Sequence, residues 1–356
     1  MTQQVFTEVT QAQLLPRVVH LGGNLYAAAF TLMKMVPARH ILLAAAARGQ
    51  IGPQTVVVET TSGTFGLALA MQCALLRRPF VMVSDPVIDA SLRRRLADLG
   101  TEIEICEQPA PAGGFQQARL HRVAEVMAAR PDSFCPRQYS NPDNPASYSI
   151  VADHLRASLG TIGCVVGPVG SGGSMCGTVS RLREAEPGVQ AIGVDTQHSV
   201  LFGAQHGRRE LRGLGNSLLP ANLDHRIFDE VHWISAAEAY ASTRQLHREH
   251  ALFHGPTSGA AYRVGRWWAG RHPDRRCVVM LPDEGYRYLE TVYDDGWIAG
   301  RDHLPPAMVP TRVRHPLLVG PSWSYYPWAR RSLQQVLARQ PLPDAAGSHH
   351  TSEIAS

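Results

Sequence analysis

The sequence predicts an α/β protein whose mostly parallel β-sheets are covered by helices. From Thr55 onward, short apolar runs typical of strands alternate with runs of helix formers, and a second series of this kind begins at Cys164. The expected strands are almost continuously apolar, as in parallel sheets that are buried on both faces. Two such series predict two α/β lobes that meet near residues 140–165.

The first part of the chain is expected to open with a β-hairpin. Strands at 15–19 and 25–30 flank the turn Gly22-Gly23-Asn24. A run of helix formers at 38–48 stops at Gly49, a typical helix end. The first series then has expected strands at 56–58, 80–83 and 102–106 and helices at 65–76, 90–99 and 115–129.

The second series differs from the segment that follows it. Its expected strands are 164–166, 191–194 and 277–281, and its expected helices are 175–186 and 236–249. Between residues 305 and 343 many prolines are expected to break regular structure, apart from one possible helix at 329–339. From Asp344 the chain is small and polar, which predicts disorder.

Composition excludes several classes of function. The net charge is only +4 and the arginines are interleaved with acidic residues, so nucleic-acid binding is not indicated, whereas affinity for small anions is. Six scattered cysteines without a CxxC pair predict reduced thiols. The amino terminus does not resemble a signal peptide and no apolar run is long enough for a bilayer, so we expect a cytoplasmic protein that makes no membrane contact.

Lys34 is the most unusual residue of the chain, because it is the only lysine among 34 basic residues and the other 33 are arginines. Its neighbours Leu32, Met33, Met35 and Val36 are apolar. Apolar surroundings lower the pKa of an ammonium group and favour a nucleophilic amine of the Schiff-base type. The alternative is a surface lysine whose stem packs on the protein while its charge reaches water.

Hydroxyl-rich and glycine-rich loops follow several expected strands. The segment 59–66 enters a helix with a Thr/Ser-rich turn that suits a carboxylate or phosphate, or is an ordinary helix cap. The segment 167–174 has the glycines and serines of a phosphate cup, or forms a tight turn. Further turns lie at 255–260 and 281–288. Together with one lysine, these are the parts that a pyridoxal phosphate site requires.

The order of these segments resembles the cysteine synthase group of fold type II pyridoxal-phosphate enzymes, from about Leu15 to Trp297. Five segments carry the resemblance: 59–66, 138–145, 170–174, 212–215 and 282–289. The segments 83–86 and 112–114 are most similar to the siderophore-pathway branch of the family, which forms N-(2-amino-2-carboxyethyl)-L-glutamate. An ungapped register back from Gly49 places Lys34 on the Schiff-base lysine of the family.

The resemblance implies a fold of two three-layer α/β lobes with twisted, mostly parallel sheets and the site in the cleft between them. Residues 1–34 and 146–300 would form the larger, cofactor-binding lobe, and residues 35–145 the smaller, mobile lobe. Residues 301–356 would be a proline-rich C-terminal extension that is partly disordered. The resemblance also implies a homodimer.

The resemblance further assigns roles to residues of the predicted site. Lys34 would carry the cofactor and act as the catalytic base, Thr257 would meet the pyridine nitrogen, and Thr64 takes the place of the asparagine that contacts the ring oxygen. The remaining assignments are Gly170, Ser171, Gly172, Gly173 and Ser174 for the cofactor phosphate, and Thr61, Ser62, Gly63 and Gln138 for the substrate carboxylate. No metal site is predicted, because His247 and His250 do not form a HExxH motif.

The implied reaction is a β-replacement on O-phospho-L-serine, or on another O-activated serine, with an amine that the resemblance makes L-glutamate. The product would be a 2,3-diaminopropionate precursor for a siderophore or peptide natural product. Two alternatives remain open: a cysteine synthase-like enzyme that uses sulfide or a thiol, and a catalytically weakened cofactor-binding partner protein. The second is raised by Leu32, Met35 and Val36, which replace polar residues of the family, and by Thr64.

Two weaker signals complete the prediction. The run 93–95 of three arginines on an expected helix is interpreted as a solvated face, with attraction of a phosphorylated substrate as the alternative. Serine hydrolase chemistry is not indicated, because the chain has no GxSxG elbow.

Overall fold

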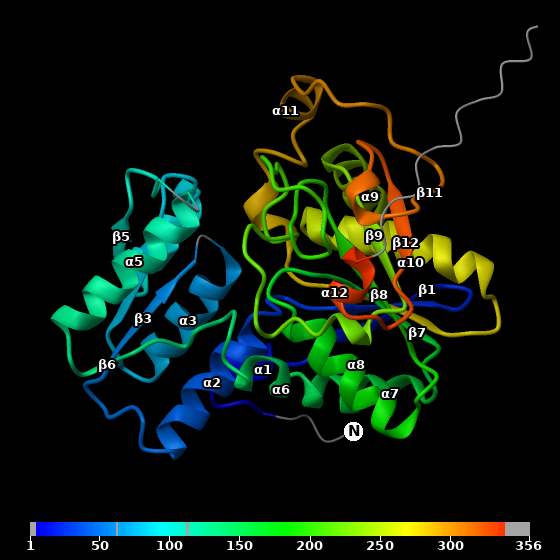
Figure 1. The fold of residues 1–356 in the computed structure, drawn as a ribbon. Coiled ribbons are helices and arrows are strands. Elements are labelled where there is room, and N and C mark those ends of the chain that lie inside the picture. The colour runs from blue at the N-terminus through cyan, green and yellow to red at the C-terminus, as the bar shows by residue number, and fades with distance from the viewer. Residues whose placement is uncertain (1–4, 62, 112–113, 339–356) are drawn as a thin grey trace, which may run out of the picture.

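The computed structural model describes residues 5–61, 63–111 and 114–338. Their strands form two sheets, one of eight strands in the order β1-β2-β10-β7-β8-β9-β12-β11 and one of four strands in the order β5-β4-β3-β6. Figure 1 shows the four-stranded sheet and its helices beside the larger group of elements. The prediction of an α/β protein with mostly parallel sheets is confirmed.

The four-stranded sheet is parallel throughout. Its strands are β3 (Val56–Thr60), β4 (Phe80–Ser84), β5 (Glu102–Ile105) and β6 (Ser133–Phe134). Because successive side chains of a strand point to opposite faces, Val57 packs with α2 (Met35–Ala47), α3 (Thr64–Leu75) and α4 (Ala90–Asp98), and Val58 packs with α5 (Gly114–Ala129). The sheet is therefore the middle of three layers.

The eight-stranded sheet is parallel at its centre, and one antiparallel pair lies on each side of that centre. Its strands are β1 (Arg17–Gly22), β2 (Leu25–Ala29), β7 (Cys164–Pro168), β8 (Gln190–Asp195), β9 (Glu230–Trp233), β10 (Cys277–Leu281), β11 (Thr311–Arg312) and β12 (Ser324–Pro327). The predicted hairpin is β1–β2, and β2 then pairs in parallel with β10, far along the chain.

Helices cover both faces of this sheet as well. Val278 packs with α7 (Ser149–Leu159) and α8 (Gly173–Ala185), whereas the next residue, Val279, packs with α9 (Ala236–His250) and α10 (Pro256–Arg271). The remaining elements are the short helices α1 (Val9–Ala12), α6 (Asp143–Ala146), α11 (Asp295–Ala299) and α12 (Leu333–Leu337), with 3-10 turns η1 (His225–Ile227), η2 (Gly285–Tyr288) and η3 (Pro316–Leu318). Both sheets thus have the three-layer arrangement expected from the resemblance.

The proline-rich C-terminal segment is more regular than the sequence predicts. Strand β12 joins the large sheet antiparallel to β9, and β11 pairs with β12. Pro327 is tolerated at the end of β12 because it lies beyond the residues that pair with β11. The helix expected at 329–339 is shorter, α12, because Ala329 and Arg330 adopt positive φ angles of 54° and 56°. The tail predicted to be disordered from Asp344 lies outside the described residues.

The predicted lobe boundaries remain a prediction, although the strands of the four-stranded sheet fall within residues 56–134. The sequence pattern missed the short strands β6, β9 and β12, and it also missed the 11-residue helix α7. Over the described residues, none of the helices has the length and apolar character needed to cross a membrane.

Close packing of α10 on β10 yields a test of the fold. A Cβ added at Gly265 would overlap the side chain of Val279, so Gly265→Ala is expected to lower the free energy of unfolding by about 1–3 kcal/mol. Gly270→Ala in the same helix is the control, because nothing lies within 4 Å of the added carbon. Urea denaturation of both variants measures the difference, and equal stability of the two would contradict the packing described here.

Candidate functional site

The predicted site residues gather where parallel strands of the two sheets end. Strands β2, β10 and β7 run in the same direction, so the segments that follow them meet at one edge of the large sheet. Ligands of parallel α/β sheets bind at this edge, outside the carboxyl ends of the strands. Lys34 follows β2, the loop that begins at Gly170 follows β7, and Asp283 follows β10.

Lys34 lies directly before α2, in a loop that is held by the end of β10. The backbone N–H of Met33 donates to the carbonyl of Pro282 at 2.7 Å, and Leu32 forms a β-bridge with Asp283. The Lys34 Nζ donates to the Ser171 Oγ at 3.4 Å. Burial lowers the pKa of Lys34 from its usual 10.5 to about 8. The Lys34 side chain is half-buried, and its amine lies against the predicted phosphate loop.

The predicted phosphate loop, residues 170–174, connects β7 to α8. Gly172 has a φ of +83°, and a Cβ there would lie 2.8 Å from the Cα of Leu223. A Cβ on Gly173 would overlap the side-chain amide of Asn144. The loop therefore has its shape only with glycine at these positions, and it leaves Ser171 and Ser174 buried at the amino terminus of a helix of 13 residues.

Thr257 lies in the first turn of α10 and is buried. Its Cγ2 is 3.6 Å from the position of an added Cβ on Gly213. A Cβ on Gly170 would in turn lie 3.4 Å from the carbonyl oxygen of Gly213. The turn around Gly213 therefore lies between Thr257 and the predicted phosphate loop, which puts both at the same edge of the sheet.

The predicted carboxylate-binding residues follow β3 of the small sheet. Gly63 donates its backbone N–H to the Thr61 Oγ1 at 3.2 Å, and Thr64 begins α3. The buried Glu59 carboxylate accepts the backbone N–H of Thr60 at 2.8 Å and that of Gln138 at 3.1 Å. Glu59 thus joins the end of β3 to Gln138. Ser62, which was predicted to share this role, lies outside the described residues.

Burial raises the pKa of Glu59 to about 7, while the backbone donors of Thr60 and Gln138 oppose this rise. Either protonation state can accept these two hydrogen bonds, because one carboxyl oxygen serves each N–H.

Asn144 connects the predicted cofactor and substrate groups, and sequence reasoning assigned it no role. Its side-chain amide donates to the carbonyl of Gln138 at 2.6 Å and to the Ser171 Oγ at 3.4 Å. Because Lys34 also donates to Ser171, hydrogen bonds link the lysine to Gln138 through two side chains. The only signal in the sequence was the position of Asn144 inside the segment 138–145.

These groups fit pyridoxal phosphate. The glycine loop offers buried hydroxyls to a phosphate, and Lys34 offers an amine of lowered pKa to an aldehyde. The buried Oδ1 of Asn144 has no hydrogen-bond partner among the described residues, so an acceptor faces the same region. Of the weaker signals, the arginine run 93–95 is exposed on α4, as expected for a solvated face.

Comparison with known proteins shows the family of the chain. The model of the pyridoxal-phosphate dependent enzyme family matches residues 32–283. The N-(2-amino-2-carboxyethyl)-L-glutamate synthase of Ralstonia nicotianae is 35% identical over 266 residues, which are 74% of this chain and 79% of that protein. The protein of the same name from Cupriavidus metallidurans is 35% identical over 269 residues, with the same shares.

A solved structure shares the fold. The O-acetylserine dependent cystathionine beta-synthase from Helicobacter pylori matches with a TM-score of 0.74 at 25% identity, over 81% of this chain and 99% of that one. The chain belongs to the family of pyridoxal-phosphate dependent enzymes. It has the fold type II architecture, and its cofactor is pyridoxal phosphate. The family resemblance found in the sequence is confirmed.

The lowered pKa of Lys34 can be measured directly, because the chain has no other lysine. After reductive ¹³C-methylation of the cofactor-free protein, the Lys34 resonance is expected to titrate near pH 8 and that of a denatured sample near 10.5. Between these values the unfolded chain binds the additional proton, so the destabilisation that Lys34 causes below pH 8 decreases as the pH rises toward 10.5.

Lys34→Arg identifies the resonance by removing it and leaves that of the terminal amine in place. A midpoint near 10.5 in the folded protein would show that the amine lies in water.

Proposed function

We propose that the enzyme catalyses a β-replacement on O-phospho-L-serine, or on another serine with an activated oxygen, with the amine of L-glutamate as the nucleophile. The product would be N-(2-amino-2-carboxyethyl)-L-glutamate, a 2,3-diaminopropionate precursor for siderophore or peptide natural-product biosynthesis. The observation that carries the proposal is the half-buried Lys34, whose amine lies beside the glycine-rich loop and has a pKa of about 8. The names of the curated relatives support the choice of product.

In this proposal the cofactor is held by Lys34 and by the loop 170–174, with Thr257 at the ring nitrogen. When bound, pyridoxal phosphate withdraws electrons from the substrate, which makes the α-proton acidic and permits loss of the β-substituent. A neutral hydroxyl at Thr257 leaves the ring nitrogen unprotonated, which suits β-elimination better than transamination.

Lys34 would act as the general base and then as the general acid of the reaction. A neutral amine can accept the α-proton of the substrate at Nζ, and a pKa of about 8 leaves part of the amine neutral near pH 7. The bond from Cβ to the leaving oxygen then breaks with its electron pair on the phosphate. The nucleophilic amine forms the new bond to Cβ and loses one proton, and the Nζ returns a proton to Cα.

The substrate carboxylate would be bound by Thr61, Ser62, Gly63 and Gln138. Glu59 holds Gln138 against the end of β3, and the amino terminus of α3 lies at Thr64, where helix N–H groups favour an anion. Leu32, Met35 and Val36 around Lys34 are buried in apolar cores, which keeps water away from the lysine.

A cation beside Gln138 favours an anionic substrate. Desolvation raises the pKa of Tyr139, the neighbour of Gln138, and the positive charges of Arg119 and Arg209 oppose this rise. Arg119 is paired with Asp85 at 2.7 Å, whereas Arg209 donates to the carbonyl of His198 and to Ser217. Among the described residues Arg209 forms no ion pair, and the acidic group that interacts with its charge is the buried Asp195. Burial raises the pKa of Asp195 to about 7, so part of the Arg209 charge is available to a phosphate or a second carboxylate.

The alternatives differ from this proposal in the nucleophile or in competence. Sulfide or a thiol in place of the amine would make the enzyme cysteine synthase-like, and the Helicobacter pylori neighbour is named an O-acetylserine dependent cystathionine beta-synthase. A catalytically weakened protein would bind pyridoxal phosphate and yield no product. The homodimer and the cytoplasmic location also remain proposals from the family resemblance, and light scattering of the purified protein tests the first.

Product analysis by mass spectrometry tests the proposed reaction. Phosphoserine with L-glutamate is expected to give N-(2-amino-2-carboxyethyl)-L-glutamate and phosphate, and Lys34→Ala is expected to abolish the product because no second lysine can replace it. A panel of other amines, sulfide and thiols run in parallel identifies the nucleophile. Product formation by Lys34→Ala would refute the role of the lysine, and product from sulfide alone would favour the first alternative.

If the Arg209 charge contacts the substrate phosphate, its removal should weaken the binding of phosphorylated substrates only. Arg209→Gln is expected to raise the KM for phosphoserine about tenfold, as for loss of one hydrogen bond to a charged group, and to change the KM for uncharged O-acetylserine little. Arg208→Gln is the matched control, since Arg208 is an exposed neighbour. An equal rise for both substrates would mean that Arg209 acts on the fold and not on the phosphate.

A further inference from the structure

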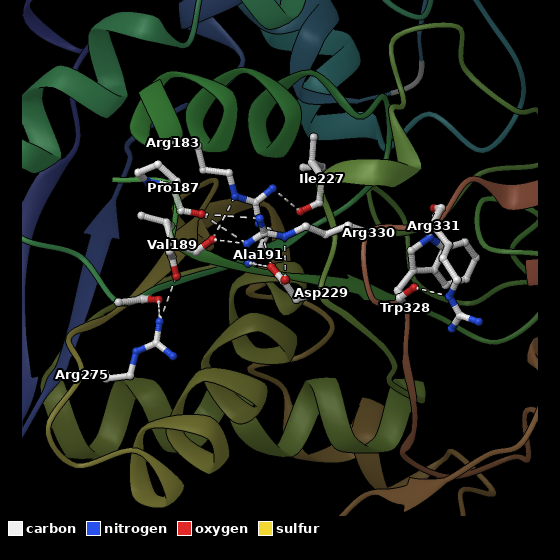
Figure 2. A network of polar contacts seen from close by, with 12 residues as sticks. Arg183, Pro187, Val189, Ala191, Ile227, Asp229, Arg275, Trp328, Arg330 and Arg331 are labelled. Carbon is white, nitrogen blue, oxygen red and sulfur yellow. Dashed lines mark hydrogen bonds and ion pairs between the residues drawn. The ribbon is translucent and has the colours of Figure 1, made fainter. Parts of the chain in front are cut away.

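The C-terminal residues 324–338, which we call the strap, lie outside the segment that matches the family model. The strap consists of β12, a connection that contains Trp328, and α12. Trp328 is fully buried and belongs to the same apolar core as residues of α8, so the strap is part of the large sheet's packing. Figure 2 shows its connection beside the end of α8 and the segment around Asp229.

The strap is fastened by a carboxylate that several groups share. Asp229 accepts hydrogen bonds from the Arg330 Nε at 2.8 Å, from the Arg183 Nη2 at 2.7 Å and from the backbone of Ala191 at 2.8 Å (Figure 2). The backbone N–H groups of Ala329 and Arg330 donate to carbonyls of residues 229 and 228. These bonds hold two successive residues in the left-handed region, which residues other than glycine rarely adopt.

Trp328 and α12 of the strap pack on the short segment of residues 199–203. The Trp328 ring meets that of Phe202 edge to face, with centroids 5.2 Å apart. Gly203 has a φ of +80°, and a Cβ there would lie 2.6 Å from Leu337 and 3.6 Å from Leu333. Two leucines of α12 thus cover this glycine, and their contact fixes how closely α12 approaches the segment.

The same segment is hydrogen-bonded to the loop at the predicted cofactor site through Asn216. Val200 donates its N–H to the carbonyl of Asn216 at 3.0 Å, and the N–H of Asn216 donates to the Ser199 Oγ at 3.1 Å. The side chain of Asn216 donates to the carbonyl of Gly170 at 3.4 Å. Contacts therefore run without a break from α12 to the first residue of the predicted phosphate loop.

We propose that the strap positions the loop that binds the cofactor phosphate. By packing on Phe202 and Gly203 the strap fixes the position of Asn216, and Asn216 fixes the position of Gly170 at the start of the loop. The proposal rests on the proposed function in one respect, the assignment of residues 170–174 as the phosphate loop. A segment outside residues 32–283, which match the family model, would then contribute to cofactor binding. Helix α12 would affect the site through the intervening residues and not by direct contact.

The test compares two cofactor forms on the cofactor-free protein. Leu333→Ala/Leu337→Ala is expected to weaken binding of pyridoxal phosphate about five- to tenfold, a typical coupling between sites, while binding of pyridoxal, which lacks the phosphate, stays unchanged. Leu317→Ala/Leu318→Ala is the matched control, because these leucines lie outside the strap and are more exposed, at 57% and 50%, than Leu337 at 40%. Absorbance titration measures both affinities.

A structural role alone would give a different result. Equal losses for the two cofactor forms, or no loss for either form, would overturn the proposal. Circular dichroism establishes that the variant is folded at the assay temperature, and Leu337→Ala alone replaces the double variant if it is not. Because the readout is binding, the result does not depend on whether phosphoserine is turned over.

The hydrogen-bonded connection through Asn216, which we call the relay, can be tested separately. In an Asn216→Ala background the two strap substitutions are expected to cause no further loss of affinity for pyridoxal phosphate, because the connection to Gly170 is already broken. Additive losses would overturn the relay.

Discussion

The position of Lys34 between two apolar cores is the constraint on which the site depends. Met33 and Val36 belong to the core shared with α7 and α8, whereas Leu32 and Met35 belong to the core between α2, α3 and the small sheet. The lysine stands at the junction of these cores, so its neighbours cannot move without disturbing one of them. Desolvation of the amine, and with it the lowered pKa, follows from this position.

A few buried polar side chains then join the two sheets around the lysine. Asn144 reaches Gln138 on one side and Ser171 on the other, and Glu59 ties Gln138 to the end of β3. Buried polar groups of this kind specify a geometry because each unmade hydrogen bond would be costly. The apolar residues next to Lys34 determine the position of its amine, and these polar residues determine which groups surround that amine.

Much of the fold was predictable from local patterns. The apolar strands and helical runs of both series appear at the expected places, and the loop 170–174 follows its strand as the glycines indicated. Strand β12 was not predictable, because its pairing with β9 depends on residues nearly a hundred positions away. For the same reason the roles of Asn144 and Asn216 were not predicted. The hydrogen-bond partners of a short polar side chain are distant in the sequence and are known only from the folded structure.

The pairing of β2 with β10 affects the order in which the protein can form during synthesis. The small sheet is encoded within residues 56–134 and can assemble early, whereas Ala29 meets its neighbour Leu281 only after most of the chain has left the ribosome. Pairings between such distant residues form slowly. The edge that holds Lys34 is therefore among the last parts to be completed, and a nascent chain shorter than about residue 281 has no centre for its large sheet.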